Sequence, residues 1–137
     1  MTVAIFDIDH FKQINDSYGH IAGDALLIAL VELIVKQIRQ DDTLSRYGGE
    51  EFALILPGTP LVAARSLITR LKNAITDITH RTDDGQLIKI TVSIGIATSL
   101  EHAEHIRHAG DLLHAADTAL YAAKHAGRNQ IKEWNSQ

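Results

Sequence analysis

Apolar residues recur along the chain at two different spacings, which predict an alternation of strands and helices. The stretch from Thr2 to Phe6 is β-branched and apolar, and it predicts a buried strand that ends in the acidic sequence Asp7-Ile8-Asp9. The following "HFKQINDSYGH" predicts a short helical piece that Gly19 closes. Asp24 then precedes an amphipathic helix, whose apolar positions at helical spacing are Leu27, Leu30, Ile34 and Ile38.

The rest of the chain shows the same two periodicities. The segments "DDTLSRY" and "EFALIL" flank Gly48-Gly49, which predicts a β-hairpin closed by a two-residue glycine turn. Residues 61–78 predict a second amphipathic helix, and "LIKITVSIGIAT" (residues 87–98) predicts a strand from its alternation. Residues 112–126 predict a helix that ends at Gly127, and "NQIKEW" predicts a last short strand.

This order of elements predicts an α/β (α+β) fold with a mostly antiparallel central sheet and helices packed on its faces. The 137 residues are enough for one domain with a sizeable core, so we expect a single domain over residues 1–137. Hydrophobic residues make up 45% of the chain and charged residues 22%, which is typical of a globular protein.

Charge and composition exclude several classes of function. The formal net charge of −4 provides no general basic field, so we expect no nucleic acid polymer as a partner. The absence of cysteine excludes disulfides and thiolate metal sites. The sequence contains neither a signal peptide nor an apolar run of roughly 20 residues, so we expect a cytoplasmic domain without membrane contact.

Two pairs of acidic residues are candidates for a metal site. Asp7 and Asp9 share a face if the first strand continues, and they are either solvated at the strand end or part of a site for a hard cation such as Mg²⁺. A hairpin beside that strand would bring Glu50 and Glu51 to the same place. Four carboxylates packed together would call for a cation. For the hairpin taken alone, a glycine turn with exposed glutamates is the simpler interpretation.

Other polar residues suggest a nucleotide. Gly48 and Gly49 allow positive φ in the turn and leave room for a phosphate to approach the backbone. Three cations far apart in the sequence are either solvated or gathered around a polyphosphate: Lys12, Lys124 and Arg128. Asn15 and Asp24 offer an amide and a carboxylate that suit a guanine edge, although spacing alone favours Asp24 as a helix N-cap. The residues therefore indicate a magnesium-dependent enzyme acting on a nucleoside triphosphate, with the reaction left open.

Four stretches of the chain closely resemble the GGDEF domain of bacterial diguanylate cyclases, in its GGEEF variant. They are "FDIDHFKQINDSYGHIAGD", "RYGGEEF", "TVSIGIA" and "ADTALYAAKHAGRNQI". The resemblance runs from the first predicted strand to the last. It implies a palm-like fold, similar to nucleotidyl cyclases and ferredoxin-like domains. It also implies that the domain condenses two GTP into cyclic di-GMP and two pyrophosphates.

The resemblance also assigns roles to particular residues. It implies a Mg²⁺ site, with Mn²⁺ as a substitute, formed by Asp7, the Ile8 backbone carbonyl and Glu50. Glu51 is implied to be either a further ligand or the group that helps to deprotonate the attacking 3′-hydroxyl. The implied GTP-binding residues are Lys12, Asn15, Asp24, Gly48, Gly49, Lys124 and Arg128. For Asp24, the resemblance outweighs the interpretation as an N-cap.

Partners follow from the same resemblance. Each family domain holds one GTP and works as an antiparallel homodimer, so an isolated domain can be monomeric. Arg39 and Asp42 form an RxxD pair at the family's distance from Gly48-Gly49, and with Arg70 they imply an inhibitory site for the product. Alternatively, this segment is only a charged helix end.

The family pattern usually starts earlier, with a helix and a "D-x-L-T-x-L-x-N-R" segment, whereas here Met1 stands just before the first strand. We therefore expect a fragment of a longer signalling protein, whose other domains can anchor it to a membrane. One alternative function is a receptor that binds cyclic di-GMP without catalysis. Others are a cyclase with a different cyclic nucleotide product and a purely structural domain.

Overall fold

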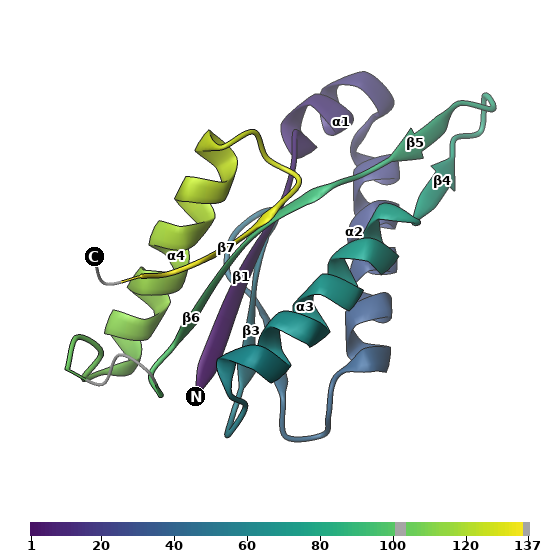
Figure 1. The fold of residues 1–137 in the computed structure, drawn as a ribbon. Coiled ribbons are helices and arrows are strands. Elements are labelled where there is room, and N and C mark those ends of the chain that lie inside the picture. The colour runs from purple at the N-terminus through teal and green to yellow at the C-terminus, as the bar shows by residue number, and fades with distance from the viewer. Residues whose placement is uncertain (101–103, 136–137) are drawn as a thin grey trace.

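A five-stranded sheet forms the centre of the computed structural model, which describes residues 1–100 and 104–135 (Figure 1). Its strands, in spatial order, are β2 (Thr43–Arg46), β3 (Glu51–Leu56), β1 (Thr2–Ile8), β6 (Val92–Thr98) and β7 (Ile131–Glu133). Neighbouring strands are antiparallel except β6 and β7, which are parallel. The prediction of a mostly antiparallel sheet is therefore confirmed, as is the position of the hairpin beside the first strand.

Helices cover both faces of this sheet (Figure 1). They are α1 (Phe11–Tyr18), α2 (His20–Gln37), α3 (Leu61–Thr76) and α4 (Ala109–His125). Because side chains alternate along a strand, β1 serves both layers. Ala4, Phe6 and Ile8 join the core cluster that includes residues of α1, α2 and α3. Val3 and Ile5 instead pack with α4, so Asp7, next in that series, is directed toward the α4 side.

The α4 helix lies unusually close to the sheet at Gly95. A Cβ atom added there would lie 2.2 Å from the Ala116 carbonyl oxygen and 2.2 Å from the Leu120 nitrogen. Backbone atoms cannot move aside cheaply, so this crossing requires glycine. The contact fixes α4 against β6 and thereby sets where the end of α4 lies over β1.

The predicted strand over residues 87–98 is divided in two. Only β6 belongs to the central sheet, whereas β5 (Leu87–Lys89) pairs with β4 (Thr79–Arg81) in a separate two-stranded sheet. This hairpin projects past the end of the sheet (Figure 1). The predicted apolar alternation still holds, because Ile88, Ile90 and Val92 all enter one core cluster.

Two helix starts differ from the prediction. The α2 helix begins at His20 with Gly19 as its N-cap, so Asp24 lies inside the helix and the N-cap interpretation of Asp24 is wrong. The α4 helix begins at Ala109, three residues before the predicted start, because His108 and Asp111 form a capping box there. Among the described residues, no helix has the length and apolar character needed to span a bilayer.

Candidate active site on the α4 face of the sheet

An acid pair and a lysine meet where β1 ends and β3 begins. Asp7 and Glu51 lie opposite each other in the antiparallel register, and α4 brings Lys124 over them. The Lys124 ammonium forms an ion pair with Asp7 Oδ2 and lies 3.7 Å from Glu51 Oε1. The Asp7 side chain is only 7% exposed, so its charge is balanced inside the fold rather than by water.

These charges perturb one another. Burial raises the pKa of the Glu51 carboxyl, and the nearby charge of Asp7 raises it further, although Lys124 opposes the change. Burial alone would lower the pKa of Lys124. The hydrogen bond and charge of Asp7, together with the charges of Glu51 and Glu50, outweigh burial and raise the pKa of Lys124. The acids therefore stabilise a cation between them.

A cavity of about 280 Å³ adjoins this cluster. Seven residues that matter to the sequence-based hypothesis line it together, although they come from distant parts of the chain: Asp7, Ile8, Asp9, Lys12, Glu50, Lys124 and Arg128. The lining thus combines carboxylates with cations. That arrangement suits a metal ion bound to a polyphosphate.

The donor set fits Mg²⁺ in this role. Its carboxylates are hard oxygen donors, and the Lys124 ammonium already lies among them as a cation would. No group of three or more His, Cys, Asp or Glu side chains suited to a metal occurs within the described ranges. Magnesium commonly takes one or two carboxylates and completes its shell with water and phosphate, so two protein carboxylates suffice.

Asp9 lines the same cavity as Asp7 and Glu50, as the hypothesis of converging carboxylates expects, but protein groups bind its carboxylate. Its Oδ1 accepts a 2.6 Å hydrogen bond from Ser93 Oγ, and its Oδ2 accepts hydrogen bonds from Thr91 Oγ1 at 2.6 Å and from the Asn129 backbone N–H at 3.0 Å. The carboxylate is thus fully engaged in holding protein segments together. The sequence pattern placed Asp9 on the same face as Asp7. It contained no signal for hydrogen-bond partners as distant along the chain as Thr91, Ser93 and Asn129.

The glycine turn between β2 and β3 also differs from the prediction. The chain leaves the ladder at Arg46 and rejoins it at Phe52, and the Tyr47 and Gly48 N–H groups both donate to the Glu51 carbonyl. Positive φ is not adopted by either glycine of the pair. A Cβ added at Gly49 would meet no atom within 4 Å. Protein contacts therefore do not explain this glycine, which leaves its backbone open to a ligand.

Arg46 is a residue of this loop that the sequence analysis overlooked. Its guanidinium donates from Nε to the Gly48 carbonyl at 3.2 Å and from Nη2 to the Gly49 carbonyl at 2.5 Å. These contacts turn the carbonyls of the loop toward Arg46. Its position immediately before the loop in "RYGGEE" was the available signal.

The pair suggested for guanine recognition lies on adjoining helices, with Asn15 on α1 and Asp24 on α2. Asp24 is exposed, whereas Asn15 Oδ1 is buried and has no hydrogen-bond partner among the described residues. A buried acceptor without a donor is costly. A ligand N–H at this position would satisfy it.

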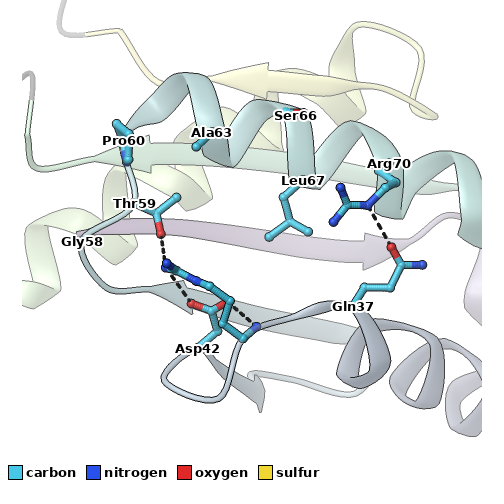
Figure 2. A pocket seen from close by; sticks show the side chains of 10 residues that line it. Gln37, Asp42, Gly58, Thr59, Pro60, Ala63, Ser66, Leu67 and Arg70 are labelled. Carbon is cyan, nitrogen blue, oxygen red and sulfur yellow. Dashed lines mark hydrogen bonds and ion pairs between the residues drawn. The ribbon is translucent and has the colours of Figure 1, made fainter.

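A second cavity, of about 370 Å³, lies between the end of α2 and α3 (Figure 2). It brings together the three residues of the suggested inhibitory site, Arg39, Asp42 and Arg70. The Arg39 guanidinium lies 3.5 Å from Asp42 Oδ1 and donates to Thr59 Oγ1 at 2.7 Å. Arg70 donates to Gln37 Oε1 at 3.0 Å across the cavity. Thr59, which anchors Arg39, had no distinguishing signal in the sequence.

Comparisons with known proteins agree on one family. The family model described as "Diguanylate cyclase, GGDEF domain" matches residues 1–130. The chain is 44% identical over 132 residues to the diguanylate cyclase DgcP of Pseudomonas aeruginosa, covering 96% of this chain but only 19% of that relative.

Two solved structures are similar along nearly the whole chain. The GGDEF domain of YfiN (TpbB) from Pseudomonas aeruginosa is 34% identical with a TM-score of 0.87, and the match covers 99% of this chain and 83% of that one. The GGDEF domain of DgcB from Caulobacter crescentus, solved with c-di-GMP, is 30% identical with a TM-score of 0.87, covering 96% of this chain and 76% of that one.

Proposed function

Because the chain belongs to the GGDEF family of diguanylate cyclase domains, we propose that it condenses two GTP into cyclic di-GMP and two pyrophosphates. The observation that carries the proposal is the acid pair Asp7 and Glu51, which lies beside a cavity lined by Glu50 and the cations Lys12 and Arg128. We expect the domain to work in the cytoplasm, where GTP is made.

In each half of the reaction, the 3′-oxygen of one GTP attacks the α-phosphorus of the other. A new P–O bond forms, the bond to pyrophosphate breaks, and the 3′-hydroxyl loses its proton. Bound Mg²⁺, held by Asp7, Glu50 and the Ile8 carbonyl, would stabilise charge on the attacking and leaving oxygens. Lys12, Lys124 and Arg128 balance the negative charge of the triphosphate. Glu51 serves either as a further metal ligand or as the base that takes the proton of the 3′-hydroxyl.

Guanine recognition is proposed for Asn15 and Asp24. The Asp24 carboxylate accepts from the ring N–H and exocyclic amine, and the Asn15 amide completes the edge. The buried, unpaired Asn15 Oδ1 supports this role. Gly48 and Gly49 let the phosphates approach the backbone, as the open space at Gly49 suggests.

The test of synthesis is incubation of the chain with GTP and Mg²⁺ at high protein concentration, with cyclic di-GMP detected by mass. We expect product from the wild type and a loss of at least about a hundredfold in Glu50→Gln and Glu51→Gln, as for other electrostatic groups at a reacting centre. Glu32→Gln, an exposed glutamate on α2, is the matched control. Binding of cyclic di-GMP without any turnover would favour the receptor instead.

We further propose that the active species is a homodimer, because the two-fold symmetric product needs two GTP and the described residues bring the suggested GTP-binding acids and cations together in one cavity. The rate per chain should then rise with protein concentration and level off once the dimer is populated. A rate per chain that is independent of concentration down to nanomolar protein would refute a transient dimer. Mn²⁺ is expected to replace Mg²⁺ in the same assay.

The cavity of Figure 2 is proposed to bind the product and inhibit synthesis. The Asp42 side chain is only 1% exposed and its Oδ1 accepts no hydrogen bond from the described residues, so a ligand donor would satisfy it. We expect micromolar cyclic di-GMP to inhibit the wild type and Arg39→Ala to relieve that inhibition. Arg107→Ala, an exposed arginine before α4, should leave inhibition intact. Equal inhibition of both variants would exclude this site.

A further inference from the structure

Asp9 is a buried acid that the proposed chemistry leaves without a role. The residue is 6% exposed, and its carboxylate accepts three hydrogen bonds. Two come from Thr91, just before β6, and from Ser93, within it. The third comes from the Asn129 backbone N–H, beyond the end of α4. Protein donors therefore occupy three of the roughly four acceptor positions of this carboxylate.

The turn that Asp9 holds has an unusual backbone. Gly127, Arg128 and Asn129 have φ values of 118°, 61° and 49° in succession. Glycine adopts positive φ without penalty, but a side chain in this region is disfavoured. Arg128 is therefore kept in a conformation that persists only where surrounding contacts impose it.

Several contacts impose that conformation. The Arg128 N–H donates to the Ala123 carbonyl at 3.0 Å, which closes the end of α4. The next N–H, of Asn129, donates to Asp9, and Lys72 Nζ on α3 donates to Asn129 Oδ1 at 2.8 Å. Of these partners, Asp9 alone is both charged and buried in β1's extension, beside the cavity that Arg128 lines.

The geometry fixes Arg128 relative to the acids. Asp9 lies just after β1, two residues beyond Asp7. Arg128 lies just after α4, four residues beyond Lys124. The Lys124–Asp7 ion pair and the Asn129–Asp9 hydrogen bond thus join the same two segments at two points. The second point restrains the orientation of the turn in addition to the backbone hydrogen bonds of Arg128 and Gln130 on either side of Asn129.

We propose that Asp9 is a positioning residue for triphosphate binding: it fixes the turn after α4 so that Arg128 faces the phosphate cavity. The proposal rests on the GTP site proposed above and adds a residue to it. Asp9 acts only through Arg128 and touches no substrate. In Asp9→Asn, a single amide oxygen replaces the two carboxylate oxygens that now serve three donors, so the Asn129 N–H competes with Thr91 and Ser93 for one neutral acceptor. The turn then relaxes toward conformations in which Arg128 leaves the cavity.

The test is a double-mutant cycle on equilibrium binding. Affinities for a non-hydrolysable GTP analogue with Mg²⁺, and for guanosine, are measured for the wild type, Asp9→Asn, Arg128→Ala and the double variant. We expect each single variant to lose about tenfold in analogue affinity, the scale of one charge-assisted hydrogen bond. The double variant should lose no more than Arg128→Ala alone. Guanosine lacks phosphates, so its affinity should not change.

Asp83→Asn, an exposed acid in the β4–β5 turn, is the matched control and should bind like the wild type. Additive losses in the double variant, or equal losses for the analogue and guanosine, would overturn the proposal. Should Asp9→Asn fail to fold, Thr91→Val removes one of the three donors and is expected to give a smaller loss confined to the analogue. An unchanged analogue affinity in Thr91→Val would also contradict the positioning role of Asp9.

Hydrogen exchange separates this proposal from the GTP site itself. The Asn129 amide should exchange slowly in the wild type and at least tenfold faster in Asp9→Asn. If the wild type binds no analogue, the proposed GTP site fails, whatever the exchange at Asn129. If the analogue binds and Asp9→Asn weakens it without faster exchange at Asn129, the GTP site stands and the positioning role is refuted.

Discussion

Gly23 lies on α2 where the helix passes over the Asn15 side chain. A Cβ atom at Gly23 would lie 1.9 Å from Asn15 Oδ1 and 3.0 Å from Asn15 Cγ. The helix thus accepts a residue of low helix propensity in its interior. The absent Cβ leaves room for the Asn15 amide, whose buried oxygen accepts no hydrogen bond from the described residues.

We expect Gly23→Ala to displace the Asn15 amide and to lower GTP affinity by about tenfold, as for one lost hydrogen bond to a buried group. Titration with a GTP analogue measures this. Gly110→Ala is the control, because that glycine is also helical and a Cβ there would meet nothing within 4 Å. Equal affinity in both variants would remove Asn15 from the guanine site.

Glu51 permits a prediction about pH and stability. Its pKa is raised in the folded state by burial and by Asp7, so between its unfolded value of 4.5 and its folded value the native state binds more protons. Stability is then lost as pH rises through that interval. We expect Glu51→Gln to unfold at higher denaturant concentration than the wild type at pH 7, with the difference vanishing below pH 4.5.

Urea unfolding at a series of pH values measures that difference. Glu32→Gln is the exposed control and should change the free energy of unfolding by less than about 0.5 kcal/mol. A Glu51→Gln variant that is less stable than the wild type at pH 7 would show that the Lys124 contact outweighs burial.

At the scale of elements, the packing of α4 on β6 depends on Gly95. We expect Gly95→Ala to destabilise the fold by about 3 kcal/mol, the upper end of the usual cost of overpacking, because the new methyl group meets backbone on two sides. Chemical denaturation measures the loss, with Gly110→Ala again as control. A loss below about 0.5 kcal/mol would mean that α4 can move off the sheet freely.

Much of the element pattern was predictable, and the failures have physical causes. Strands β1, β3 and β6 are apolar enough to be recognised locally. Strand β4 (Thr79–Arg81) was missed because its three residues carry no apolar alternation. The start of α2 was misplaced because Gly19 and Gly23 suggest a turn, whereas tertiary packing against Asn15 keeps Gly23 helical.

The candidate site was predictable as a set of residues but not as a geometry. Sequence suggested Asp7, Glu50, Glu51 and the cations. The structure gathers Asp7, Glu50 and the cations around one cavity and places Glu51 opposite Asp7. The pairing of Lys124 with Asp7 and the engagement of Asp9 by Ser93 depend on strand register and on the close approach of α4. Those are long-range properties that no local pattern contains.

At the scale of the whole molecule, two core clusters share one strand. Alternate residues of β1 enter each cluster, so the loss of either layer would expose one face of the strand on which the other layer is packed. We therefore propose that residues 1–137 fold as a single cooperative domain.

The single tryptophan offers a direct measurement of that cooperativity. Trp134 packs against the α4 cluster, and its backbone N–H donates to the Ile96 carbonyl at 2.7 Å. Tryptophan fluorescence should therefore follow the α4 layer, whereas far-UV circular dichroism follows all the helices. We expect both to give the same urea midpoint. Separate midpoints would show that the two layers unfold independently.

The central position of β1 also has a consequence for synthesis of the chain. This strand is translated before both of its neighbours. Phe6 cannot pair until Phe52 has been made on one side and Ile94 on the other. At translation rates of roughly 5–20 residues per second, its second partner emerges on the order of ten seconds later. During that interval an apolar strand has at least one unpaired edge, which is the situation in which nascent chains associate or recruit chaperones. The arrangement that joins both layers of the finished fold thus leaves one edge of its first strand open until most of the chain has been made.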